Sequence, residues 1–262
     1  MHLAKNAFRN LFGFVAVSAL VSALAAPAAA ERNPLNVDVP PGAPVVHPAS
    51  ISSHGEVYVV DPATLTCTQT TTFDDVPGGP APGFSYDGIF ASVGVFFAER
   101  FVGQTLSYAG NFDVISGSPS NPLALQPGAS GQNLNVFNFS TNVLDGLGPL
   151  GFPNFDSIGE GAMAMYFSAG QSQFSFQLVG GDAGSATLDF YRADGSLIDT
   201  IVLSGLANST YGFQRLGGVP DIAGVLIQNT DPAGIGLDNV CHDVAVVSTQ
   251  AASWGNIKSL YR

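Results

Sequence analysis

The chain has 262 residues, of which 46% are hydrophobic and only 11% charged, with 31 glycines and 19 phenylalanines. This composition excludes a disordered protein, because disordered chains are poor in apolar residues and rich in charge. After residue 30 the chain carries 20 acidic and six basic residues, a net charge of −14, which is repelled by nucleic acid and by anionic membrane surfaces and so predicts no nucleic-acid partner.

Residues 1–30 predict a secretory signal peptide. Lys5 and Arg9 precede an apolar run from Leu11 to Leu24, and Ala28–Ala30 forms an A-x-A cleavage site. The alternative is an anchoring helix, but this run is shorter than the roughly 20 apolar residues needed to span a bilayer. Gly, Pro, Asn or Asp interrupts every later apolar run. We therefore expect a secreted or cell-surface protein with no membrane span after signal cleavage.

The rest of the chain divides into three predicted parts. Residues 31–55 are rich in proline and lack periodicity, which predicts an extended leader. Residues 56–248 predict one domain, because β-sandwiches of about 200 residues often form a single domain. Residues 249–262 form a C-terminal tail.

In the first half of the domain, β-branched and aromatic residues predict short strands. The segments are Val57–Val60, Leu65–Phe73, Gly94–Phe97, Thr105–Tyr108 and Leu134–Phe139. Between the last two, Ser116–Gly131 contains three prolines and three glycines and predicts a long loop.

The second half gives clearer strand signals. Phe174, Phe176 and Leu178 alternate with polar residues, as in a strand with one buried face. Asp194 and Gly195 separate two apolar runs, and an Asp-Gly pair favours a tight hairpin turn. Strands are predicted at Ala162–Phe167, Ala186–Tyr191, Leu197–Leu203, Tyr211–Leu216, Ile222–Gln228 and Gly236–Val247. Many short strands without helical periodicity predict an all-β protein, an antiparallel β-sandwich.

Several short motifs resemble a known family. They are Thr72–Asp75 with Tyr86–Phe90, then Ala186–Leu203, then Gly234–Val240. Over residues 65–247 they are similar to galactose-binding-like jelly-roll domains of exported bacterial proteins, including substrates of exosortase-type surface sorting. The resemblance implies a sandwich of jelly-roll type, a glycan-binding or other non-catalytic role, and a structural Ca²⁺ near the first and last strands.

The C-terminal tail differs from that family, because the chain lacks the Pro-Glu-Pro motif, membrane helix and basic cluster of exosortase substrates. The segment Ser253–Arg262 instead resembles a short Trp-Gly-x-x-Lys tail found at the C-termini of exported bacterial proteins. A sorting or recognition tag and a frayed terminus are both open readings of this tail.

Cys67 and Cys241 are the only two cysteines. An oxidising compartment favours a disulfide between them, and two separately buried thiols are the alternative. In the jelly rolls that the chain resembles, the first and last strands lie side by side. The resemblance therefore implies that Cys67 is near Cys241 and that Asp75 is near Asp238.

Four acids are candidate ligands for the implied calcium ion: Asp74, Asp75, Asp238 and Asp243. Ca²⁺ takes six to eight oxygen ligands, and carboxylates on loops can supply the charged ones. The alternative is that these residues shape turns. No EF-hand spacing is present, so no linear motif supports the metal.

A glycan site on a β-sandwich usually presents an exposed aromatic ring. The only tryptophan is Trp254, in the tail. Five tyrosines are alternative platforms, although each is equally suited to the core. They are Tyr86, Tyr108, Tyr166, Tyr191 and Tyr211.

Catalysis has less support than binding. His2 lies in the signal peptide, His47 and His54 lie in or beside the leader, and His242 is next to Cys241; neither G-x-S-x-G nor H-E-x-x-H occurs. We predict a non-catalytic module that binds an extracellular glycan or a surface protein. The alternative is a secreted glycan-active hydrolase with a carboxylate pair, for which Glu99 and Glu160 are candidates.

Overall fold

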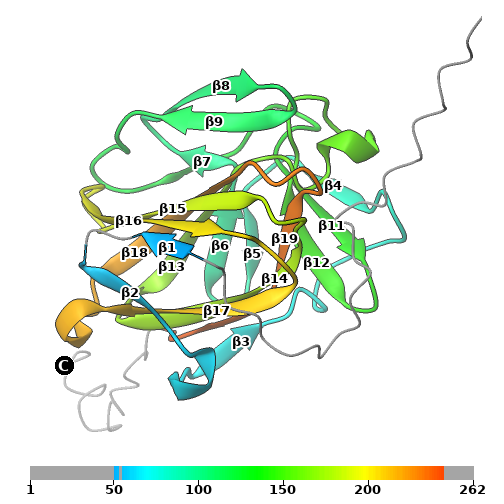
Figure 1. The fold of residues 1–262 in the computed structure, drawn as a ribbon. Coiled ribbons are helices and arrows are strands. Elements are labelled where there is room, and N and C mark those ends of the chain that lie inside the picture. The colour runs from blue at the N-terminus through cyan, green and yellow to red at the C-terminus, as the bar shows by residue number, and fades with distance from the viewer. Residues whose placement is uncertain (1–49, 53–54, 245–262) are drawn as a thin grey trace, which may run out of the picture. The chain divides into compact units, whose positions relative to one another are not determined.

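The computed structural model describes residues 50–52 and 55–244 (Figure 1). This part is all-β, with antiparallel strands and short 3-10 turns. The 3-10 turns are η2 (Pro62–Thr64), η3 (Phe155–Ser157) and η4 (Leu216–Gly218). No helix among these residues is long and apolar enough to cross a membrane. The predicted signal peptide and C-terminal tail, and most of the predicted leader, lie outside the described residues.

Sheet A has seven strands in the order β1-β16-β15-β18-β13-β6-β5. The long strands lie in the middle of this sheet, and the short strands lie at its edges. In sheet order the strands are β1 (Ser50–Ser52), β16 (Leu197–Ser204), β15 (Ser185–Tyr191), β18 (Ile222–Asn229), β13 (Met163–Gln171), β6 (Val95–Ala98) and β5 (Phe90–Ser92).

Sheet B has the order β2-β17-β14-β19-β12-β11-β4, and β3 also pairs with β19. The last strand of the described residues, β19, therefore lies in the middle of the sheet. The strands are β2 (Val57–Val60), β17 (Ser209–Arg215), β14 (Gln173–Gly180), β19 (Ile235–His242), β12 (Asn142–Gly146), β11 (Leu134–Asn138), β4 (Phe84–Tyr86) and β3 (Gln69–Thr71).

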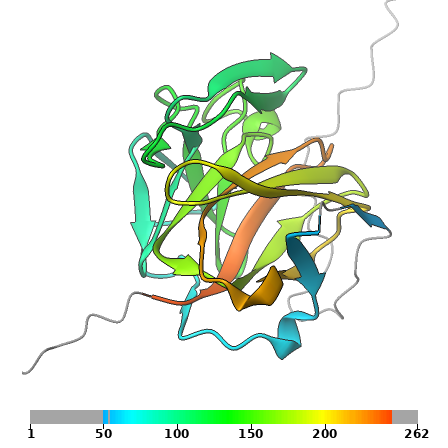
Figure 2. The same ribbon diagram turned by 90° about the vertical axis from the view of Figure 1, so that its left-hand side faces the viewer.

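Two small ribbons lie outside the large sheets. One pairs β7 (Arg100–Phe101) with β10 (Leu125–Gln126), and the other pairs β8 (Thr105–Ala109) with β9 (Phe112–Ser116). Figures 1 and 2 both show β8 and β9 at the outside of the domain. A second apolar cluster, which includes Phe101, Leu123 and Tyr191, fills the space between these ribbons and the outer face of sheet A.

The main core lies between the two sheets. Phe190 of sheet A packs 5.5 Å from Phe213 of sheet B, and Phe167 of sheet A packs 5.2 Å from Phe174 of sheet B, measured between ring centroids. Each of these rings is almost fully buried. Burial of a phenylalanine side chain contributes about 1.5–3 kcal/mol, so the aromatic residues that alternate in the sequence hold the sandwich together.

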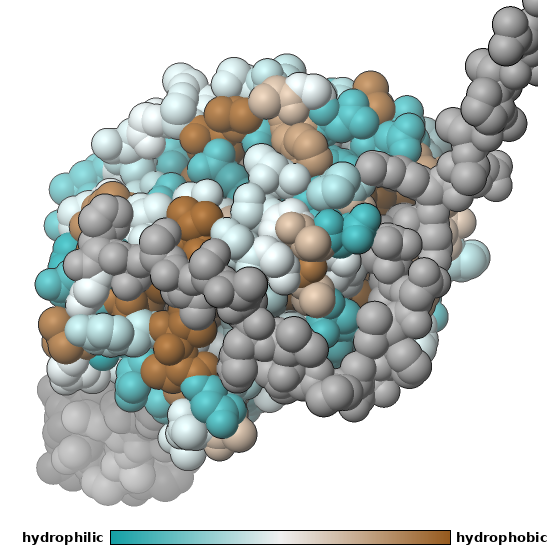
Figure 3. Space-filling view, viewed as in Figure 1, coloured by the Kyte–Doolittle hydropathy of each residue, from teal (hydrophilic) through white to brown (hydrophobic). Residues whose placement is uncertain are grey.

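On the face seen in Figure 3, the apolar residues of the described part form small patches separated by polar residues. Most of the large aromatic rings are instead buried inside the molecule.

The predicted fold class, an antiparallel β-sandwich, is confirmed; the jelly-roll connectivity stays a prediction. The hairpin at Asp194 and Gly195 is present, with β15 paired to β16 and Gly195 at a φ of 79°. Of the strand predicted at Leu65–Phe73, only β3 forms. The strand β1 lies within the predicted leader and pairs with β16.

The predicted disulfide joins Cys67 to Cys241, with a Cα to Cα distance of 5.7 Å. Cys67 lies just before β3, and Cys241 lies opposite Thr70 in the β3 and β19 pair. Cys67 is therefore near Cys241, as the resemblance implied, because β3 pairs with β19; the first strand of sheet B, β2, instead pairs with β17.

Candidate functional site

Asp238 is the predicted site residue with the most unusual surroundings. It is only 2% exposed, and its carboxylate accepts hydrogen bonds from the Thr141 hydroxyl at 2.9 Å and from the Asn239 N–H at 2.7 Å. Burial raises the pKa of Asp238 to about 6, and the negative charge of nearby Asp74 also raises this pKa. Asp74 and Asp238 are therefore the two predicted ligands that the fold brings together.

The other two predicted ligands are engaged elsewhere. Asp75 accepts a hydrogen bond from the Ser92 hydroxyl at 2.9 Å, and Asp243 accepts one from the Thr68 N–H at 3.1 Å. Asp75 and its neighbour Asp74 have different partners, because Asp74 accepts from the Asn142 N–H. Among residues 55–244, no three His, Cys, Asp or Glu side chains gather as they would around a metal ion.

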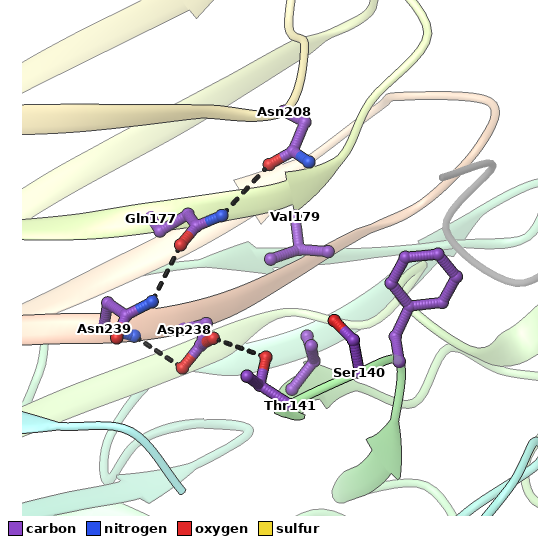
Figure 4. A pocket seen from close by; sticks show the side chains of 9 residues that line it. Ser140, Thr141, Gln177, Val179, Asn208, Asp238 and Asn239 are labelled. Carbon is purple, nitrogen blue, oxygen red and sulfur yellow. Dashed lines mark hydrogen bonds between the residues drawn. The ribbon is translucent and has the colours of Figure 1, made fainter. Parts of the chain in front are cut away.

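Asp238 lines a small hollow on the outer face of sheet B (Figure 4). The hollow has a volume of about 70 Å³. Its walls come from β12, β14, β19, the turn between β11 and β12, and the loop before β17. The lining residues are Phe139, Ser140, Thr141, Val143, Gln177, Val179, Asn208, Asp238 and Asn239.

A β-bulge in β19 positions two of these side chains. Ser175 lies opposite Cys241, whereas Gln177 lies opposite Asp238, so β19 contains one residue more than β14 between these pairs. Asn239 adopts a φ of 49°, a left-handed conformation that asparagine tolerates better than most residues. Bulges redirect side chains and are frequent next to functional sites.

Side-chain hydrogen bonds form a row along one wall of the hollow (Figure 4). The Gln177 amide N–H donates to the Asn208 carbonyl oxygen at 3.3 Å, and the Asn239 amide N–H donates to the Gln177 carbonyl oxygen at 2.8 Å. Asp238 and Thr141 continue the row through the Asn239 backbone N–H. These bonds fix the orientation of three amides and of the buried Asp238 carboxylate along the wall of the hollow.

Apart from Ser140, the rest of the hollow is apolar. Val143 and Val179 belong to a third apolar cluster on the outside of sheet B, and the half-buried ring of Phe139 packs against that cluster. The hollow thus combines oriented donors and acceptors with carbon surface. A sugar has the matching chemistry, because its hydroxyls need paired donors and acceptors and its C–H faces are apolar.

The candidate catalytic acids do not line this hollow. Glu99 and Glu160 are 1% and 2% exposed, and Glu99 forms an ion pair with Arg100. His242 is fully buried, and its Nε2 lies 3.2 Å from the Thr71 hydroxyl. Desolvation lowers the pKa of His242, which favours the neutral imidazole inside the core.

The five candidate tyrosines divide between core and surface. Tyr191 and Tyr211 are buried, Tyr86 and Tyr166 are partly buried, and Tyr108 is 52% exposed. None of them lines the hollow around Asp238. The aromatic residue that does so is Phe139, which was not a predicted platform.

Sequence reasoning also missed Thr141, Gln177 and Asn208. These residues lie on separate segments, and only strand pairing brings them to Asp238. The one local signal was the polar pair Asp238 and Asn239 within an otherwise apolar strand.

No family model, no curated protein and no solved structure matches this chain. The function is therefore inferred from the side chains of the hollow and from their chemistry.

Proposed function

We propose that this protein is an exported, non-catalytic binding module, and that the hollow around Asp238 binds hydroxyl groups of an extracellular glycan. The observation that carries the proposal is the row of Asn208, Gln177, Asn239 and Asp238 on the outer face of sheet B. Such a row offers both donors and acceptors, and neighbouring hydrogen bonds hold it in place before a ligand arrives. Preorganised polar groups bind a ligand with a smaller loss of side-chain entropy.

Export is supported by two features. One is the signal peptide predicted from residues 1–30. The other is the Cys67–Cys241 disulfide, because disulfides persist mainly in oxidising compartments.

A binding role fits the carboxylates better than hydrolysis does. A glycosidase needs two carboxyl groups that face each other across a cleft. The hollow has a single carboxylate among its lining residues, and Glu99 and Glu160 are buried. We therefore keep the hydrolase as the second choice.

A glycan array tests the proposal. The probe is the chain from residue 31 to 262, with and without Ca²⁺. Gln177→Ala and Asn239→Gly remove amides from the row, and glycine suits the positive φ at position 239. We expect both variants to lose at least tenfold in binding to the glycan that the parent recognises.

The matched control is Gln214→Ala, since Gln214 is an exposed glutamine on β17 outside the hollow. It should bind as the parent does. An array without signal, or equal binding by Gln177→Ala and the parent, would contradict the glycan proposal.

We also propose that a structural Ca²⁺ binds beside Asp74 and Asp238, the two candidate ligands that lie close together. Their charges raise the free energy of the folded protein when both are ionised, and a bound cation would offset this repulsion. A ligand that binds only the folded state stabilises it by mass action. We expect a chelator to lower the melting temperature and millimolar Ca²⁺ to restore it.

Variants locate the ion. Asp238→Ala should abolish the response to calcium, whereas Asp75→Ala should keep it, because Asp75 is hydrogen-bonded to Ser92 instead. Thermal scans that superimpose with chelator and with calcium would remove the metal from the proposal.

A further inference from the structure

A second hollow lies on the outer face of sheet A. It has a volume of about 310 Å³ and is lined mainly by carbon. Its floor includes Phe96 of β6 and Tyr166 of β13, which are paired in the sheet register, and its rim includes Ile89, which is 52% exposed. The lining residues are Ile89, Phe96, Leu123, Ala124, Leu125 and Tyr166. Of these residues, Ile89 and Ala124 are exposed and Phe96, Leu125 and Tyr166 are half-buried, so the hollow leaves apolar surface open to a partner.

The described chain ends close to this hollow. A Cβ built on Gly94 would lie 3.1 Å from Val244 Cγ1 and 3.2 Å from the Ser168 hydroxyl, so Val244 passes beside Ser168. Met165 and Phe167 point into the core between the sheets, whereas Tyr166 belongs to the outer face. Because side chains alternate along a strand, Ser168 shares the outer face with Tyr166, about 7 Å away.

The segment that follows Val244 has the chemistry to fill the hollow. Residues 245–262 contain Trp254, Ile257, Leu260 and Tyr261, and they carry two basic residues and no acid. Trp254 is ten residues beyond Val244, and ten extended residues span roughly 33 Å. The hollow begins at Tyr166, only about 7 Å from Ser168. Length therefore does not prevent the segment from folding back.

Charge also favours this occupant. Residues 55–244 contain eighteen acidic and three basic side chains. All three arginines in that range form ion pairs with acids. The exposed Asp87 lies two residues before Ile89, and hydrogen bonds from Gly131 and Ser130 lower its pKa and keep it charged. A cationic apolar segment is thus complementary to the rim.

We infer that residues 253–262 dock into the hollow on the outer face of sheet A, with the Trp254 ring as the anchor. Tryptophan has the largest apolar surface of any side chain and an N–H that can stay at the wet rim. The Trp-Gly-x-x-Lys motif is then a segment that covers an apolar surface of its own domain. This inference does not depend on glycan binding.

Trp254 reports on this docking, because it is the only tryptophan in the chain. The protein is the chain from residue 31 to 262. We expect native emission to be blue-shifted and protected from acrylamide, relative both to the urea-unfolded protein and to a peptide of residues 251–262. Ile89→Ser should shift the emission to the red and at least double the quenching constant.

The control is Leu197→Ser, which removes an equally exposed apolar side chain from β16. It should leave Trp254 fluorescence unchanged, and circular dichroism checks that both variants fold. Native emission equal to that of the peptide would overturn the inference, as would an unchanged spectrum in Ile89→Ser. A blue shift that disappears on dilution would also overturn it, because it would place the segment on a second copy.

Discussion

Asn239 shows how one residue shapes the candidate site. Its left-handed backbone allows the extra residue in β19, and this bulge lets Asp238 and Asn239 reach Thr141 and Gln177. An ordinary strand would place successive side chains on opposite faces of the sheet. The local distortion is therefore what assembles the polar row.

The raised pKa of Asp238 predicts a pH dependence of stability. Its folded pKa is about 6, above the ordinary value of 3.8, because burial disfavours the charged form. Between about pH 4 and 6 the folded state keeps a proton that the unfolded state loses, so the free energy of unfolding falls as pH rises. The expected loss from this residue is on the order of 2 kcal/mol.

Asp238→Asn should remove that share of the loss, since asparagine stays neutral and can still accept from Thr141. Urea unfolding at pH 4.5 and at pH 7 measures how much the free energy of unfolding changes between the two pH values. Asp113→Asn should act similarly, because burial raises the pKa of Asp113 to about 6. Asp194→Asn is the control, since hydrogen bonds from Ser196 lower the pKa of that exposed residue. An equal pH slope in Asp238→Asn and the parent would contradict the assignment.

The sequence predicted Asp238 as a site residue but did not predict which residues lie around it. Asp238 was named from a short motif, while its neighbour was expected to be Asp75 and is Asp74. Consecutive residues in a turn have different partners, and the sequence does not reveal which one faces a distant strand. Gln177 and Asn208 were missed for the same reason, because register decides their position.

At the level of elements, the predicted strands that match best are those with alternating apolar residues. β14, β15 and β16 agree closely, since alternation reports a strand with one buried face. β12 was missed. Its sequence, Asn-Val-Leu-Asp-Gly, has weak strand propensity, and its pairing with β11 and β19 holds it in the sheet.

The β15 and β16 hairpin gives a test at this level. Gly195 has a φ of 79°, and a Cβ there would lie 2.5 Å from the Ser120 carbonyl oxygen. Gly195→Ala should therefore lower the free energy of unfolding by about 1 kcal/mol for the left-handed backbone strain and by about 1–3 kcal/mol more for the clash. Urea unfolding measures the sum.

Gly110 is the matched control for this substitution. It turns the β8 and β9 hairpin with a φ of 65°, but a Cβ there meets nothing within 4 Å. Gly110→Ala should lower the free energy of unfolding only by the left-handed backbone strain, about 1 kcal/mol. Equal losses for the two variants would mean that the contact with Ser120 contributes nothing.

For the whole molecule, the Cys67–Cys241 bond is the main covalent constraint, because it spans 174 residues. The chain-entropy estimate for so large a loop is about 5 kcal/mol, and measured gains are often smaller. In urea unfolding, a Cys67→Ser, Cys241→Ser double variant should have a free energy of unfolding lower by up to this amount. A reductant should destabilise the parent and leave the double variant unchanged.

Peptide mapping under non-reducing conditions checks the bond itself. A single peptide pair that contains both cysteines is expected. Recovery of free thiols at both positions from the natively expressed protein would contradict the predicted bond.

The central place of β19 governs when the domain can fold. Sheet B stays in two separate halves until Ile235–His242 has been synthesised, because this strand alone joins β14 to β12. Contacts between such distant parts of a chain form slowly, on a timescale of roughly milliseconds to seconds for all-β proteins. A nascent chain that has been synthesised only to residue 234 therefore leaves the β2-β17-β14 half of sheet B unjoined to the β12-β11-β4 half.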